Sequence, residues 1–96
     1  MNRKELYDFA KSLDQKDAPV GALIQAIDEA NQQLNYAVYK IASKLDLAKQ
    51  HVGSFEVAAD GFVHRANDYA IAAAKLNTLF LTLAVVLQQQ GHKVDY

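Results

Sequence analysis

The stretch PVGALIQAIDEANQQLNYAVYKIASKLDLAKQH, residues 19–51, decides the fold class of this chain. Apolar side chains recur in it at alternating steps of four and three residues, which is the heptad spacing of a packed helix. Pro19 suits a first helical turn, because its missing N–H would have no partner there, and Gly53 is a natural stop. The spacing predicts one helix from about 19 to 51, roughly 50 Å long. The heptad series is Val20, Ile24, Ile27, Asn31, Leu34, Val38, Ile41, Leu45, Ala48 and Val52.

A second long helix is predicted from about 67 to 90. Asn67 can cap its start, and Gly91 is a suitable residue just beyond its end. This helix is apolar on two sides, and a helix of that kind is normally covered on two sides. The first side holds Tyr69, Ala72, Ala73, Leu76, Leu79, Phe80, Leu83, Val86 and Leu87, and the second holds Ile71, Ala74, Thr78, Leu81 and Val85.

The two ends of the chain and the connection at 54–65 carry weaker signals. Asn2 and Glu5 have the spacing of a capping box, which predicts a short N-terminal helix, and the tail after Gly91 is expected to be loose. Asp60-Gly61 lies between short runs rich in aromatic and β-branched residues, a pattern typical of a small β-hairpin at 54–65. Hairpin, loop and helix all stay open for this connection.

These elements predict a mainly α, single helical domain over residues 1–96: a long helical hairpin (about 19–51 and 67–90) plus the short N-terminal helix. A compact monomer is one solution. The other is a homodimeric helical bundle, which we favour because the last helix keeps a second apolar side. The expected oligomer interface consists of Asn31, Ile71, Leu81 and Val85. Asn31 either fixes the register of such a bundle or marks where the seam reaches solvent.

Composition excludes several classes of protein. Of the 96 residues 51% are hydrophobic and 22% are charged, and the net charge is −1, which is a globular composition without the basic stripe of a nucleic-acid-binding protein. The most apolar stretch, residues 69–87, is interrupted by Lys75 and Asn77, so no membrane contact is expected. There is no cysteine, and the first residues lack the apolar core of a signal peptide. The expected location is the cytoplasm.

Residues with catalytic or metal-binding chemistry form no convincing constellation. Asp60, His64 and Asp68 are spaced four apart and would line one face of a continuous helix, where they could hold a divalent metal. The spacing loses that meaning if Asp60-Gly61 is a turn, so we expect a turn aspartate, a strand histidine and a capping aspartate. No phosphate loop, nucleophile elbow or zinc spacing is present. We therefore expect no catalytic residue, metal or cofactor.

The function expected from this pattern is a small, non-enzymatic, homo-oligomeric interaction or regulatory module. Its partners would be a second copy and a further protein of unknown identity. The alternative is a small-molecule-binding protein or small enzyme with a pocket between the hairpin and the helices. Tyr36, Tyr39, His64 and Tyr69 would bind the ligand or partner, because tyrosines combine a large apolar ring with a polar tip.

Overall fold

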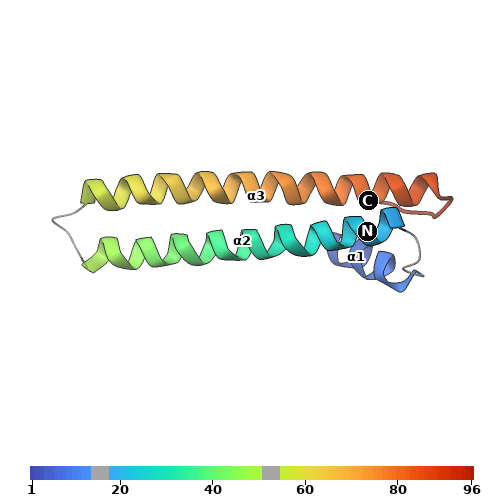
Figure 1. Cartoon of the computed structure of the whole chain (residues 1–96), viewed down its shortest axis with the longest axis horizontal. Helices are drawn as coiled ribbons and strands as arrows, with labels where there is room; N and C mark the ends of the chain where they lie inside the picture. The colour runs from blue at the N-terminus through green and yellow to red at the C-terminus, as the bar shows by residue number, and fades with distance from the viewer. Residues whose placement is uncertain (14–17, 51–54) are drawn as a thin grey trace.

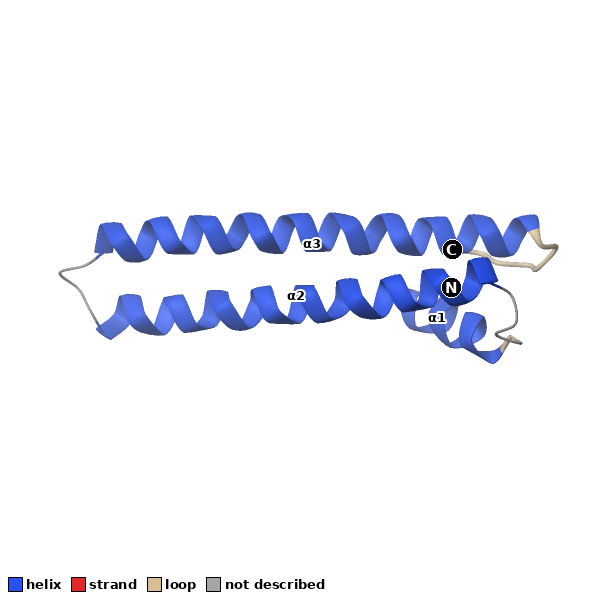
Figure 2. Cartoon of the chain, in the orientation of Figure 1, coloured by secondary structure: helices blue, strands red, loops and turns tan. Residues whose placement is uncertain are grey.

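A computed structural model describes residues 1–13, 18–50 and 55–96, with side chains described for residues 1–13, 18–43 and 63–96. The chain forms three α-helices: α1 (Arg3–Ser12), α2 (Ala18–Gln50) and α3 (Phe55–Gln89). Helices α2 and α3 run side by side as a long antiparallel hairpin, and α1 packs against one end of it (Figure 1). Every described element is helical, which confirms the predicted mainly α class (Figure 2).

The molecule is a rod. Its principal extents are 59 × 19 × 18 Å, and its radius of gyration is 17.8 Å. A compact domain of this length has a radius of gyration of about 12.5 Å. The elongation arises because α1 covers only the part of the hairpin where α2 begins and α3 ends (Figure 1).

Helix α1 begins with the capping box that the sequence predicted. The Asn2 side chain accepts a hydrogen bond from the Glu5 backbone N–H at 2.8 Å, and the Glu5 carboxylate accepts one from the Asn2 backbone N–H at 3.2 Å. Two otherwise unpaired donors of the first turn are thus satisfied. Leu6 and Ala10 are fully buried, and they anchor α1 to the hairpin.

The contact between α2 and α3 follows one edge of the predicted heptad stripe. Val20 and Ile27 are buried and Leu34 and Ile41 are half-buried, each one heptad after the last. Beside them lie buried alanines at 30 and 37, whereas the predicted seam positions Asn31 and Val38 are exposed. The heptad stripe is wider than the surface that one neighbouring helix covers, so its second edge faces outward. The predicted members Leu45, Ala48 and Val52 lie outside the residues whose side chains are described.

Helix α3 starts twelve positions earlier than predicted, and this overturns the β-hairpin. Residues 55–65 are helical, so Asp60-Gly61 is not a turn and Asn67 is not a cap. An isolated two-stranded hairpin is marginal in water, and no third strand occurs among the described elements. Extending a helix that has already formed through one glycine costs only about 1 kcal/mol relative to alanine.

The C-terminal tail is packed, which corrects the expectation that it is loose. Gly91, with φ of 91°, occupies the left-handed position after the helix. The Gly91 N–H donates to the Gln88 carbonyl and the His92 N–H donates to the Leu87 carbonyl, the pair of bonds that defines a Schellman motif. The tail then turns back, so that Val94 is buried and its carbonyl accepts a bond from the Gln88 amide.

Candidate functional site

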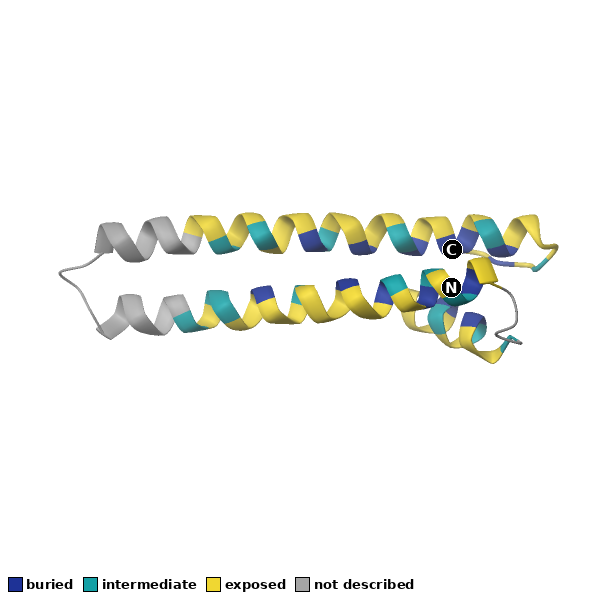
Figure 3. Ribbon diagram, viewed as in Figure 1, coloured by how far each residue is buried: buried dark blue, intermediate teal, exposed yellow. Residues whose placement is uncertain are grey.

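The three apolar residues predicted for the oligomer interface lie on one side of α3 and are exposed. Ile71 is 69% exposed, Leu81 is 49% exposed and Val85 is 50% exposed. Their spacing places them on one face, together with exposed Ala74 and Thr78. The side of α3 that packs against α2 is buried instead, and it consists of Ala72, Leu76, Phe80, Leu83 and Leu87. The second apolar side of this helix therefore lies on its back and is uncovered in a single copy (Figure 3).

Asn31 is exposed and lies at the edge of α1. It lines a hollow of about 540 Å³ that is bounded by Arg3 and Tyr7 of α1 and by Leu76 of α3. Within a single copy Asn31 marks the point where the heptad stripe of α2 meets solvent.

Of the four residues predicted to bind a ligand or partner, Tyr36 alone lines one of the two described grooves. Tyr36, Tyr39 and Tyr69 are exposed, and so is His64. The Lys40 ammonium lies 5.3 Å from the Tyr36 ring centroid, which is a cation–π contact along the surface of α2. Because the described structure has no β-hairpin, the predicted pocket between a hairpin and the helices does not form.

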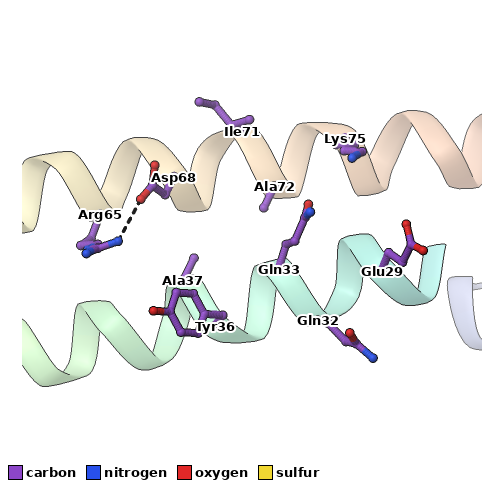
Figure 4. Close-up of a pocket in the computed structure, with 10 residues that line it drawn as sticks. All are labelled: Glu29, Gln32, Gln33, Tyr36, Ala37, Arg65, Asp68, Ile71, Ala72 and Lys75. Atoms are coloured by element: carbon purple, nitrogen blue, oxygen red, sulfur yellow. Dashed lines mark hydrogen bonds and ion pairs between the residues drawn. The ribbon is translucent and has the colours of Figure 1, made fainter. Parts of the chain in front are cut away.

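Tyr36 does line a groove on one flank of the helix pair, without the other three. The groove has a volume of about 610 Å³, and its apolar lining consists of Tyr36, Ala37, Ile71 and Ala72. Polar lining comes from Glu29, Gln32, Gln33, Arg65, Asp68 and Lys75. The view in Figure 4 shows Ala72 directed toward α2, whereas Ile71 points away from it. The groove is an open channel between two helices, and its polar groups do not close around one point.

Asp60, His64 and Asp68 all lie within the helix α3. Among the described side chains they do not form a metal site. The Asp68 carboxylate instead pairs with the Arg65 guanidinium at 3.4 Å, one turn earlier in the same helix (Figure 4). The Asp60 side chain lies outside the described residues. Among the side chains that are described, no group of three histidines or acids is placed to bind a metal ion.

Among the described residues, Arg3 makes polar contacts that the sequence did not indicate. Arg3 belongs to a small N-terminal basic cluster, yet its guanidinium donates to the Asn77 side chain at 3.2 Å and to the Tyr96 hydroxyl at 3.4 Å. The same group lies 5.1 Å from the centroid of the Phe80 ring. These contacts link α1, α3 and the tail, and no pattern in the sequence indicates them, because their partners are 74 and 93 positions away.

Part of α3 has the length and composition of a membrane-spanning helix. Residues Val63–Gln89 contain an 18-residue window with mean hydropathy 1.9, and 33% of that window is buried within the molecule. The interruptions at Lys75 and Asn77 therefore do not exclude a span on composition alone, contrary to the sequence expectation. Apolar core helices of soluble proteins share this length and composition.

The described residues present an exposed apolar helical surface. Comparisons of the chain with protein families, with curated proteins and with solved structures give no match.

Proposed function

We propose that this chain is a small, non-enzymatic interaction module of the cytoplasm that works as a homodimer. Apolar helical surface that one copy leaves uncovered would be covered by a second copy. The dimer would then be the unit that docks on a further protein partner. A partner of the same sequence is the simplest occupant, because most soluble oligomers are symmetric assemblies of identical chains.

The observation that carries this proposal is the amount of surface that the chain exposes. It exposes 6573 Å². A compact monomer of 10.6 kDa is expected to expose about 5,500 Å². The excess is roughly 1,000 Å² per chain, and a standard stable interface buries about 800 Å² per partner.

The character of the exposed side chains supports the same proposal. Large apolar residues are exposed along both long helices, including Val38 and Tyr39 on α2 and Ile71, Leu81 and Val85 on α3. Exposed apolar side chains are ordinary when they occur singly, but several of them on each of two long helices are consistent with an interaction surface.

Light scattering coupled to size-exclusion chromatography tests the proposal. We expect a mass of twice the 10.6 kDa chain at tens of micromolar protein. A monomer at that concentration would contradict the homodimer. Flotation with phosphatidylcholine–phosphatidylglycerol vesicles is the companion measurement. The protein should stay unbound, and co-flotation would assign the apolar surface of α3 to lipid instead.

A further inference from the structure

Helix α1 identifies one flank of the α2–α3 hairpin by the contacts that it makes there. The Tyr7 hydroxyl donates to the Asp28 carboxylate of α2 at 2.7 Å. The Arg3 guanidinium donates to the Asn77 side chain of α3 and lies over the Phe80 ring. The flank occupied by α1 therefore includes Asp28 on α2 and Asn77 and Phe80 on α3.

The same flank continues beyond α1 with no helix on it. Positions seven residues apart lie on one face of a helix, so a shift of seven away from α1 follows this flank along the hairpin. On α2, adding seven to Asp28, Asn31 and Leu34 leads to positions 35, 38 and 41. On α3, which runs in the opposite direction, subtracting seven from Leu76, Asn77 and Phe80 leads to positions 69, 70 and 73. The resulting surface, here called the distal face, consists of Asn35, Val38, Ile41, Tyr69, Ala70 and Ala73.

The exposure of two residues of α2 shows how far along the hairpin α1 covers this flank. Ile24 and Val38 are fourteen positions apart in α2, and they share a face. Ile24, beside α1, is 5% exposed, whereas Val38, on the distal face, is 48% exposed. Helix α1 has ten residues and spans about 15 Å, which is too short to reach the second position.

The distal face carries no charged side chain among its six residues. The opposite flank of the same hairpin differs, because Glu29, Arg65, Asp68 and Lys75 line its groove. Over the six residues of the distal face, two copies can meet without placing like charges together. A face of this kind can pack against the same face of a second copy, because a two-fold interface brings the same patch of each copy into contact.

We infer that a second copy of the chain docks its distal face on this distal face, with the two hairpins antiparallel. This inference rests on the proposed homodimer and assigns its surface and orientation. In a parallel pair the two α1 helices would lie opposite each other and hold the hairpins about one helix diameter, or 10 Å, apart. In the antiparallel pair the uncovered segments of the two hairpins overlap, and each α1 lies outside that overlap. The centre of the dimer then contains α2 and α3 of both copies, and each end contains α1, α2 and α3 of one copy.

The position of the two-fold axis follows from the length of the uncovered segment. That segment of α2 extends from Asn31, at the edge of α1, to the last helical residue, Gln50. Its midpoint lies between Lys40 and Ile41, and the exposed position that continues the distal face next to that midpoint is Ala42, one heptad after Asn35. Residues at position 42 of the two copies should therefore be neighbours. Residues at position 31 should be about 30 Å apart along the bundle.

The absence of cysteine from the sequence makes disulfide cross-linking a direct test. The single variants Ala42→Cys, Asn31→Cys and Val85→Cys all place a thiol at an exposed position. After mild oxidation we expect Ala42→Cys to form a covalent dimer and the other two variants to remain monomeric on a non-reducing gel. Efficient cross-linking of both Ala42→Cys and Asn31→Cys would overturn the antiparallel orientation.

Cross-linking of Val85→Cys alone would place the interface on the back of α3 and overturn the assigned surface, while leaving the homodimer intact. If none of the variants cross-links, the unsubstituted chain distinguishes the two failures. A dimer by light scattering would then overturn only the distal face, whereas a monomer would overturn the homodimer as well.

A matched pair of charge substitutions provides a second test. Val38 and Val85 are both valines and are 48% and 50% exposed, but only Val38 lies on the distal face. Val38→Glu should raise the dimer Kd at least about tenfold, because it buries a carboxylate without a partner. Val85→Glu should change the Kd less than about twofold. Circular dichroism of both variants checks that the helices are intact, and the reverse ranking would contradict the assignment.

Discussion

The two halves of the α2–α3 hairpin have the same secondary structure but different coverage. Where α1 and the tail join the hairpin, the buried side chains include large ones such as Ile24, Phe80 and Leu83 beside small ones such as Ala84. In the half beyond α1, the described side chains that are buried on α2 and α3 are Ala37 and Ala72 (Figure 3). A pair of helices can bury small residues between them, but it has no third wall to enclose large ones.

The comparison separates what holds the fold from what remains available for binding. Burying a large apolar side chain stabilises a protein by roughly 1.5–3 kcal/mol, and burying only the methyl group of alanine contributes less. The three-helix end should therefore supply most of the stability of one copy. The two-helix end keeps apolar area that only a further helix could remove from water.

The largest effect should come from Leu83→Ala at the three-helix end. Leu83 is fully buried, so we expect a loss of about 3 kcal/mol in the free energy of unfolding. Leu81→Ala is the control two residues away, and it should cost less than about 1 kcal/mol because Leu81 is exposed. Urea denaturation at one fixed protein concentration measures both. Equal losses would show that the back of α3 is covered in solution.

A smaller effect is expected from Asn2→Ala, which tests how firmly α1 holds the three-helix end. The substitution removes the side-chain acceptor for the Glu5 N–H and should cost about 1 kcal/mol. Asn67→Ala is a suitable control, because Asn67 is exposed within α3, lies outside the distal face, and alanine favours a helix interior. If Asn2→Ala has no effect on the urea midpoint, the capping box does not contribute to the stability of α1.

The smallest effect concerns the two-helix end and is a gain in stability. Gly61 lies inside α3, so Gly61→Ala should stabilise the chain by about 0.5–1 kcal/mol. In a tight β-hairpin turn the same glycine would need a positive φ, and alanine would then destabilise the chain. Thermal unfolding followed by circular dichroism gives the sign of the stability change. A lowered unfolding midpoint would contradict the helix at Gly61 and favour the β-hairpin.

Much of the fold could be predicted from local patterns. The capping box at Asn2, the α-helical period of residues 19–50 and the Gly91 stop are short-range signals, and the structure confirms all three. The two apolar sides of α3 were also visible, because each repeats at helical spacing. Asp60-Gly61 misled the prediction for an equally local reason: the dipeptide favours a turn only when two strands can pair and pack.

The burial of individual residues could not be predicted, because it depends on how far α1 extends along α2 and α3. The heptad stripe of α2 includes both Ile24 and Val38, and only the reach of α1 makes one buried and the other exposed. The packed tail depends on partners far away in the chain, such as Arg3 with Tyr96. For the same reason the sequence could name candidate tyrosines but not show that Tyr36 lines a groove beside Ala72 of α3.

Hydrogen–deuterium exchange as a function of protein concentration tests most directly whether a second copy completes the two-helix end. The backbone amides of residues 35–41 and 69–73 should exchange more slowly as the concentration rises through the dimer Kd. The amides of residues 20–27 and 80–87, already enclosed by α1 and the tail, should not change. Exchange at residues 35–41 and 69–73 that is the same at every concentration would contradict the account.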